Sequence, residues 1–157
     1  MRHDYAFVSR WHVVASPDRC WAVLEESLRT GVVHWWPAVR FEQVTADAGT
    51  ALAPGDTIRL VVRSPIGYRL RITLALTEVI AGRAIAATSA GDLAGRGRLD
   101  LVSAGTGSEL TWSWQVEVRK RWMRAVGPVV RPAFEAAHRA VMSRGERGLA
   151  VHLNDPA

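Results

Sequence analysis

Cysteine is nearly absent from this sequence of 157 residues, since Cys20 is its only one. An internal disulfide is therefore excluded, and a single thiol fits a reducing compartment. Long apolar runs are missing as well: none approaches the ~20 residues that cross a bilayer. The charged start, Met1–Tyr5, is followed by no apolar stretch and does not resemble a signal peptide. We therefore expect a cytoplasmic protein without a transmembrane segment.

Lysine is equally scarce, because Lys120 is the only lysine among 20 basic residues. The net charge of +5 is compatible with an anionic partner such as nucleic acid or a membrane surface. The basic residues are scattered, however, and the longest run of them is Arg119–Arg121. Scattered arginines are typical of a solvated surface, so we expect no nucleic-acid partner.

Clusters of chemically active side chains are also lacking. The five histidines are dispersed, and none has a second metal ligand at helical spacing, so we expect neither a metal nor another cofactor. No Gly-x-Ser-x-Gly elbow occurs. Gly95–Gly97 lacks the lysine and the following helix of a phosphate loop, and it is more typical of a β-bulge or a tight passage beneath a helix. Only His138 and Tyr68 remain as weak candidates for catalysis.

What the sequence does contain is material for one core. Hydrophobic residues make up 48% of the chain, and seven of the residues are tryptophans. At this length roughly 70% of the unfolded surface can be buried on folding. The length and the lack of any linker predict a single domain spanning residues 1–157.

Most of the chain up to Val118 has the pattern of strands and turns. Alternating apolar and polar residues predict half-buried strands, and short turns separate them. Ser64–Gly67 suits a type I turn with proline second and glycine fourth. The expected strands are Tyr5–Val14, Val39–Val44, Ile58–Arg63, Tyr68–Leu76, Arg83–Ala90, Arg98–Leu101 and Leu110–Val118.

Helices are predicted at two places. Ser16 followed by Pro17 is a good helix start, and this helix should end near Thr30–Gly31. We interpret His34–Pro37 as a short second helix or a tight loop. The other helical segment is Arg121–His152, whose apolar residues recur three or four positions apart.

Two prolines interrupt that C-terminal pattern. Pro128 and Pro132 predict a break or kink near Gly127–Pro132, with regular helix from there to Leu149. Trp122 and Met123 in front of the break could then gate a pocket. A helix that follows a run of strands must bury its apolar stripe on their sheet.

The order of these elements resembles that of the START-like (SRPBCC, birch-pollen-allergen-like) superfamily, and within it the bacterial polyketide cyclase/dehydrase-type proteins. The resemblance implies an α+β helix-grip fold: a seven-stranded antiparallel sheet wrapped around a long, proline-kinked C-terminal helix, with two short helices between strands 1 and 2. The matching residues are Trp11–Val13, Ala15–Pro17, Trp21, Trp35–Pro37, Gly91–Gly95, Leu110–Trp114, Pro128, Arg131, Phe134, His138, Met142, Gly145 and Leu149.

The resemblance also implies a cavity between the sheet and the helix that binds a small hydrophobic molecule, such as an aromatic, polyketide-like or lipid ligand. A polyketide cyclase or aromatase using the same cavity is an alternative, and an interaction protein with a filled core is another. The residues expected to bind the ligand are Trp36, Tyr68, Leu99, Leu101, Trp112, Trp114, Val130, Phe134, His138 and Met142.

Several of these residues have two interpretations. His138 could orient a ligand oxygen or transfer a proton, or it could lock helix to sheet through a hydrogen bond to a carbonyl or a sheet side chain. Trp112, Trp114 and Tyr68 could line a cavity or fill it. Trp35 and Trp36 could form a lid or the edge of a portal, or they could simply pack the short helix under the sheet. The outward Arg59, Arg63, Arg69 and Arg71 could bind an acidic partner, but protection against edge pairing explains them better.

Overall fold

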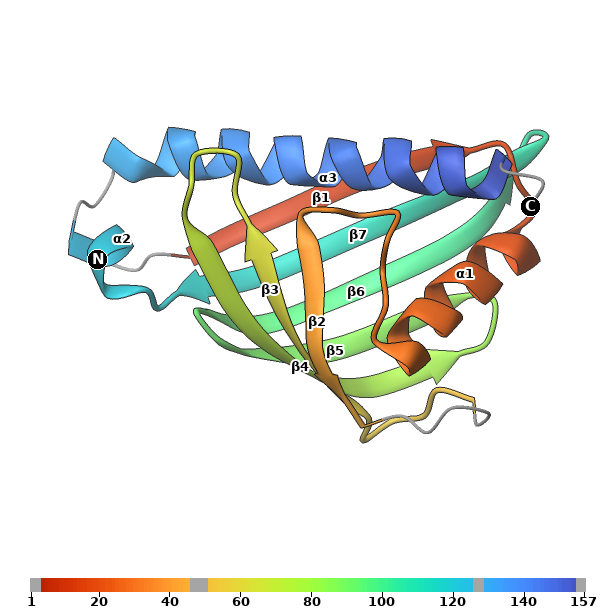
Figure 1. Ribbon diagram of the computed structural model, residues 1–157, viewed down its shortest axis with the longest axis horizontal. Coiled ribbons are helices and arrows are strands. Elements are labelled where there is room, and N and C mark those ends of the chain that lie inside the picture. The colour runs from red at the N-terminus through yellow and green to blue at the C-terminus, as the bar shows by residue number, and fades with distance from the viewer. Residues whose placement is uncertain (1–3, 46–50, 126–128, 155–157) are drawn as a thin grey trace.

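The computed structural model describes residues 4–45, 51–125 and 129–154. Figure 1 shows a strongly curved sheet with one long helix lying across its open side. The elements are β1 (Asp4–Val13), α1 (Pro17–Thr30), β2 (Val39–Val44), β3 (Thr57–Arg63), β4 (Arg69–Ile80), β5 (Ala84–Gly91), β6 (Leu93–Ala104), β7 (Gly107–Val118), α2 (Arg121–Ala125) and α3 (Val130–Asn154).

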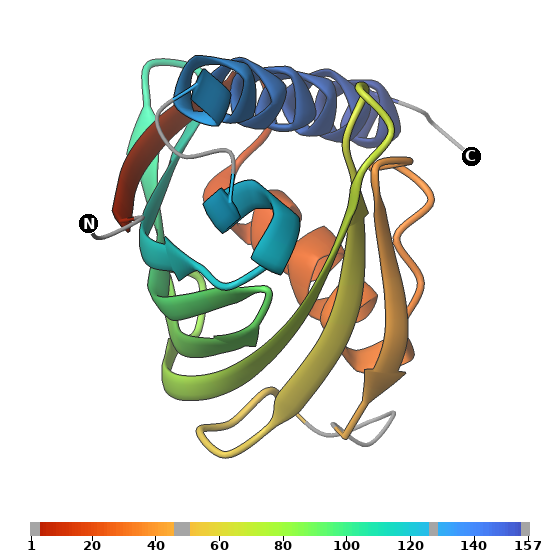
Figure 2. The same cartoon turned by 90° about the vertical axis from the view of Figure 1, so that its left-hand side faces the viewer.

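The strands form a single antiparallel sheet in the order β1-β7-β6-β5-β4-β3-β2. Strands that follow each other in the chain are neighbours from β2 to β7. The first strand, β1, pairs over its whole length with the last strand, β7. The sheet bends around α3, and α1 and α2 lie at its two opposite ends (Figures 1 and 2). This arrangement confirms the predicted helix-grip α+β fold.

Helix α1 begins and ends where its sequence signals indicate. The Ser16 hydroxyl accepts a hydrogen bond from the Arg19 backbone N–H, and Pro17 occupies the first turn. At the other end Gly31 has a φ of 74°, and its N–H donates to the Ser27 carbonyl. A residue without a Cβ adopts this left-handed conformation at little cost, so Gly31 stops the helix.

The second short helix expected between β1 and β2 is replaced by the tight loop, the other form that the sequence allowed. Residues 34–38 form turns, in which the Val39 N–H donates to the Trp36 carbonyl at 3.0 Å. Neighbouring positions of a helix point about 100° apart, whereas Trp35 and Trp36 are both buried with their rings stacked. The turns bring both indoles inside, and a helical turn would separate them.

The C-terminal segment is divided into two helices. Helix α2 is described to Ala125 and α3 from Val130. The predicted break near Gly127–Pro132 falls largely on residues 126–128, which lie outside the described residues. Pro132 stands in the first turn of α3, where its missing N–H would have no partner in the helix. Pro132 therefore starts the helix instead of kinking it, and α3 continues past Leu149 to Asn154.

The first turn of α3 is fixed to the edge of the sheet by Arg131. Its guanidinium donates to the Asp4 carbonyl at 2.8 Å and lies over the Tyr5 ring at 4.3 Å from the centroid. Stacking of a guanidinium on an aromatic face adds to the hydrogen bond. The N-terminal end of α3 is therefore held against β1.

Strand β6 is longer than expected, because it includes the glycine-rich stretch. Gly95 and Gly97 pair in unbroken register with β5 and β7, so the predicted β-bulge at Gly95–Gly97 is wrong. The reason for Gly97 is steric: a Cβ there would lie 2.9 Å from the ring of Trp114 on the neighbouring strand. Irregular register occurs instead between Phe41 and Gln43 and between Leu76 and Glu78.

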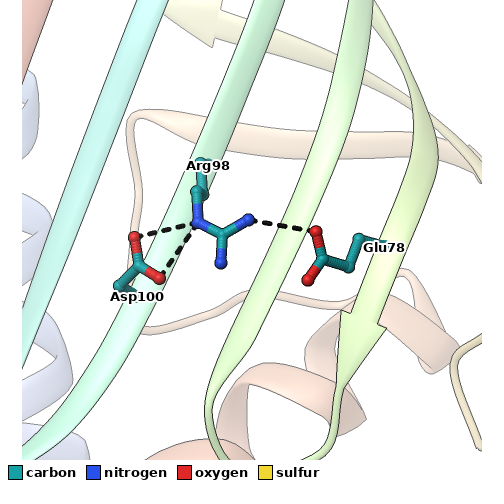
Figure 3. A network of polar contacts seen from close by, with 3 residues as sticks. All are labelled: Glu78, Arg98 and Asp100. Carbon is teal, nitrogen blue, oxygen red and sulfur yellow. Dashed lines mark hydrogen bonds and ion pairs between the residues drawn. The ribbon is translucent and has the colours of Figure 1, made fainter.

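One ion-pair network crosses three strands on the outer face of the sheet (Figure 3). Arg98 on β6 binds Asp100 on its own strand at 3.0 Å and Glu78 on β4 at 3.1 Å. Ala86 of β5 lies between Glu78 and Arg98 in the register, and its small side chain leaves the path free. The side chains of the hairpin arginines, Arg59, Arg63, Arg69 and Arg71, are exposed on the two neighbouring strands β3 and β4.

Candidate ligand-binding cavity

A cavity of about 200 Å³ lies between the inner face of the sheet and α3. Every strand contributes to its lining, together with α1, the 33–36 turn and α3. Nearly all of the lining atoms are apolar side-chain carbons, which favours apolar molecules over water. An apolar cavity of roughly 150 Å³ is large enough for benzene, so this one has room for a small ring compound.

Eight of the ten residues predicted to bind a ligand line this cavity. Leu101 and Val130 do not. Leu101 pairs with Leu110, which in turn pairs with Trp11, and these three side chains form a filled part of the core. Val130 packs against the core in the first turn of α3. The lining residues are Trp36, Tyr68, Leu99, Trp112, Trp114, Phe134, His138 and Met142.

Four tryptophans pack together, and three of them, Trp35, Trp36 and Trp112, line the cavity. Trp11 is the centre of the group, with ring centroids 5.2 Å from Trp36 and 4.9 Å from Trp112. The Trp35 indole donates to the Ser27 hydroxyl on α1 at 3.1 Å, and the Trp36 indole donates to the Val141 carbonyl on α3 at 2.9 Å. Both rings are buried and anchored, so their geometry is that of a packed wall.

Two glycines of α3 make this packing possible. A Cβ on Gly145 would lie 2.6 Å from an atom of the Trp36 ring and 2.7 Å from the Trp11 ring. A Cβ on Gly148 would collide with the backbone carbonyl of Trp35. Gly148 has no role among the expectations drawn from the sequence. Two glycines three residues apart within a helix are the signal that predicts a close backbone approach.

A second aromatic group consists of rings from β1 and α3 together with Tyr68, the residue before β4. The His138 imidazole stacks on Phe7 with centroids 3.9 Å apart and planes inclined by 18°. Phe134 lies edge-on to Tyr5 at 4.6 Å and stacks on Tyr68 at 6.1 Å. Contacts of this kind attach the N-terminal half of α3 to β1 and to the turn before β4.

His138 is held in its neutral form by these surroundings. Burial, and to a smaller degree the positive charge of Arg139, together lower the pKa of His138 from 6.5 to about 4. Its Nε2 atom is buried without a hydrogen-bond partner among the described residues. The ring is therefore attached to the sheet by stacking on Phe7, and Nε2 makes no hydrogen bond to a carbonyl or a sheet side chain there.

Tyr68 contributes an apolar ring to the cavity, and its hydroxyl stays protonated. Burial raises the pKa of Tyr68, and a hydrogen bond with the Ser64 hydroxyl opposes this shift. Ser64 is itself buried and lines the cavity. No hydrogen bond joins Tyr68 to His138 within the described residues, so these two candidates do not form an acid–base pair.

Helix α2 lies across the end of the cavity next to Tyr68. Figure 2 shows this short helix in the opening between the sheet and α3. Met123 is buried in the core, while Trp122 is 46% exposed and meets the Tyr68 ring edge-on at 5.8 Å. Of the two residues predicted to gate a pocket, Trp122 thus contacts the lining residue Tyr68, and neither Trp122 nor Met123 belongs to the lining itself.

The Gly97 position gives the cavity a flat floor. Trp114 lies directly over Gly97, and Ala87 of β5 pairs with Gly97 on its other side. Trp114, Gly97 and Ala87 all line the cavity. A broad ring over small neighbours leaves a shallow, flat surface that suits a planar molecule.

Within the described residues we looked for three other features: a metal site, a membrane-spanning helix and a reactive thiol. Residues 4–45, 51–125 and 129–154 contain no group of three His, Cys, Asp or Glu side chains placed to hold a metal ion. None of the helices in these ranges combines the length and the apolar character that crossing a bilayer requires. Cys20 is fully buried in α1, and burial raises the pKa of its thiol.

Solved structures with this fold include proteins from several bacteria. TTHA0849 from Thermus thermophilus has a TM-score of 0.72 at 14% identity, covering 95% of this chain and 97% of that chain. The Zhui aromatase/cyclase from Streptomyces sp. R1128 has a TM-score of 0.67 at 16% identity, covering 96% and 94%. Ara h 8.0201 has a TM-score of 0.59 at 12% identity, covering 93% and 97%.

These likenesses show a common fold, and sequence comparison adds the family. No curated protein matches the sequence. The model of the family described as "Polyketide cyclase / dehydrase and lipid transport" matches residues 6–150, which is most of the chain. The matched range begins in β1 and ends in α3, so it contains the whole cavity. The chain therefore belongs to the polyketide cyclase/dehydrase and lipid transport family.

Proposed function

We propose that the protein binds a small hydrophobic ring compound in the cavity between the sheet and α3. The observation that carries this proposal is the lining: apolar side chains from all seven strands surround a space of about 200 Å³. Apolar burial supplies the driving force for such a ligand, and aromatic walls supply flat contact area. The family description, with its reference to lipid transport, supports a hydrophobic ligand.

Cyclase or aromatase activity is the alternative function. The family description and the likeness to the Zhui aromatase/cyclase favour it. A neutral His138 that lines the cavity is in the correct form to accept a proton. General acid–base chemistry also needs a second group within reach of the reacting atoms, and Tyr68 is not hydrogen-bonded to His138. Binding is therefore the better-supported function.

Native mass spectrometry of the freshly purified protein tests the proposal. We expect a co-purified molecule of low mass that is released on denaturation. A titration of tryptophan fluorescence with 1-indanone and indane then measures binding directly, because Trp36, Trp112 and Trp114 line the cavity. Saturable quenching is the expected result. An unliganded mass together with no saturable change for either compound would overturn the proposal.

A cavity-filling variant makes the test specific. Ala87 faces the cavity from β5, so Ala87→Phe should occupy the space and reduce affinity about tenfold or more. Ala136→Phe, on the exposed side of α3, is the matched control and should bind like the natural protein. Equal affinities for the two variants would place the bound compound outside the cavity.

The alternative cyclase activity is tested separately. The protein is mixed with a poly-β-ketone chain, and mass spectrometry measures whether the chain loses water.

A further inference from the structure

A second hollow lies on the outside of the molecule, beside the last third of α3. It is an open groove of about 950 Å³ between α3, the 34–38 turns and the turn that joins β3 to β4. Figures 1 and 2 show that these two loops rise beside the same side of the helix. The volume is in the range of small-molecule sites. The groove therefore has room for a ligand of its own.

The walls of the groove are held together by backbone contacts. The Arg63 backbone N–H donates to the Ala38 carbonyl at 2.7 Å, which joins the end of β3 to the 34–38 turns. On the other side, Gly148 of α3 approaches Trp35 so closely that a Cβ there would collide with the Trp35 carbonyl. All four residues belong to the lining. The groove is therefore a fixed feature of the fold.

The lining of the groove is strongly basic. Among the described residues it contains three arginines and no Asp or Glu. Arg144 and Arg147 come from α3, where side chains three positions apart are neighbours, and Arg63 comes from the end of β3. All three are exposed, and their guanidinium groups make no ion pair or hydrogen bond with the described residues. Three like charges around one groove repel each other.

Two structural roles that arginines often have do not apply here. Strand β3 lies between β2 and β4, so Arg63 does not protect a sheet edge. Arg63 is paired with Arg69 in the register of β3 and β4, and like charges directly opposite each other destabilise a sheet. Arg144 and Arg147 lie more than a turn before α3 ends at Asn154, whereas a helix C-terminus stabilises cations only within its last turn. A bound anion would offset the repulsion in both places.

The guanidinium group determines which anion fits. Its planar fork donates two parallel hydrogen bonds to a phosphate or a carboxylate, and it stays charged at any physiological pH. A phosphate monoester carries about −1.5 to −2 charge at pH 7, so a single one does not neutralise three arginines, and two phosphate groups do. Pro37, Pro65 and Val151 in the same lining offer apolar contact to an organic part of the ligand.

We propose that the groove binds a soluble organic diphosphate through Arg63, Arg144 and Arg147. Arg63 holds the phosphate groups from the sheet, and the two helical arginines hold them from α3. A lipid headgroup has the same phosphate chemistry, but a concave groove fits a free molecule better than the surface of a bilayer. The inference does not depend on the proposed function, because none of the three arginines lines the apolar cavity.

Isothermal titration calorimetry with inorganic pyrophosphate at low salt tests the site. We expect saturable binding, about tenfold or more tighter than that of inorganic phosphate. Arg63→Gln, Arg144→Gln and Arg147→Gln should each weaken pyrophosphate about tenfold, which corresponds to the loss of a charge-assisted hydrogen bond. Arg10→Gln, exposed on the edge strand β1, is the matched control: it changes the net charge equally and should bind like the natural protein.

A conservative variant and nuclear magnetic resonance supply a second readout. Lysine keeps the charge and lacks the planar fork, so Arg144→Lys should recover only part of the affinity that Arg144→Gln loses. In ¹⁵N-labelled protein the backbone signals of Gly148 and Val151 should shift on addition of pyrophosphate, and that of Arg10 should not. The substituted arginines are exposed, so each variant should keep the urea midpoint of the natural protein, which shows that the fold is intact.

The control variant and the other ligands can each overturn the proposal. Failure of pyrophosphate to bind, or an equal loss in Arg10→Gln and the groove variants, would mean that the arginines form only a solvated surface. Equal affinities for phosphate and pyrophosphate would exclude a site for two phosphate groups. Sedimentation with vesicles of phosphatidylcholine and phosphatidic acid that pyrophosphate does not reverse would make a lipid headgroup the ligand. Tighter binding of hexaglutamate than of pyrophosphate would make the groove a docking site for an acidic protein segment.

Discussion

The indole N–H of Trp36 donates a 2.9 Å hydrogen bond to the carbonyl oxygen of Val141, and this bond joins the loop after α1 to the middle of α3. The bond forms only because α3 presents bare backbone at Gly145, next to the Trp36 ring, and at Gly148, next to the Trp35 carbonyl. The position of the long helix over the cavity thus depends on the absence of two side chains.

Replacing Gly148 by Ala should lower the free energy of unfolding. In an exposed helix this change stabilises by about 1 kcal/mol, because alanine is the better helix former. Here the added methyl group collides with the Trp35 backbone, and overpacking of this kind costs about 1–3 kcal/mol. Urea denaturation measures the difference. Ser143→Ala, on the exposed side of the same helix, is the control and should be neutral or stabilising; a stabilised Gly148→Ala variant would contradict the close approach.

The stability of the protein should depend on pH through His138. Its pKa is about 4 in the folded protein and 6.5 in the unfolded chain, so between these values the unfolded state binds the extra proton. The stabilising contribution of His138 is therefore complete above pH 6.5 and is lost as the pH falls towards 4, by roughly 3 kcal/mol in total. Phe7 of β1 is stacked on the ring, and Arg139 is the charge that acts on it.

The measurement is the free energy of unfolding at pH 7 and at pH 4.5 for the natural protein and for His138→Phe. The natural protein should lose more stability between pH 7 and pH 4.5, because only it contains the imidazole that takes up a proton on unfolding. The carboxyl groups contribute equally to both proteins and cancel in the comparison. His152→Gln, at an exposed position of the last turn of α3, should keep the natural profile. Parallel losses in the natural protein and His138→Phe would exclude a buried, neutral His138.

The network in Figure 3 should contribute little to stability, and only at low salt. Arg98, Glu78 and Asp100 are each more than a third exposed, and ion pairs in such positions are screened by salt. Arg98→Gln should lower the urea midpoint slightly at low ionic strength and not at 1 M NaCl. Adding Glu78→Gln to that variant should cause almost no further loss. An equal loss at both salt concentrations would mean that the arginine stem packs on the sheet.

The place of Trp122 predicts an effect on rates. Its ring lies edge-on to Tyr68 at the end of the cavity covered by α2. Trp122→Ala should raise the association and dissociation rate constants of 1-indanone together by several-fold, with a nearly unchanged Kd. Stopped-flow fluorescence measures both rates, and Val151→Ala, exposed near the far end of α3, is the control. A rise in the dissociation rate alone would mean that Trp122 binds the ligand and does not gate it.

The sheet and α1 could be predicted from sequence because their signals are local. Alternation marks the strands from Tyr5 onward, and Ser16, Pro17 and Gly31 mark the two ends of α1. The first half of β6 carried no such signal, since glycines show no alternation of side chains. Its strand conformation follows from pairing with β5 and β7, and glycine is needed at position 97 because the ring of Trp114 lies there.

The candidate site was predictable to a similar degree. Periodicity identified the inward faces of β7 and α3, which contribute eight of the lining residues. It could not distinguish lining from filled core, so Leu101 and Val130 were included although they lie outside the cavity. The unpaired state of Trp112 and His138 depends on the side chains that reach them from distant parts of the chain, and no local pattern encodes it.

The edges β1 and β2 of the sheet do not pair with each other, and α3 spans the gap between them. In a closed barrel, the strand number and shear fix the internal radius. Here the width of the interior depends on the size of the side chains that separate one helix from the sheet. Substitutions on the inner face of α3 can therefore enlarge or shrink the interior without changing any hydrogen bond between the strands. This makes the architecture easy to adapt to ligands of different size.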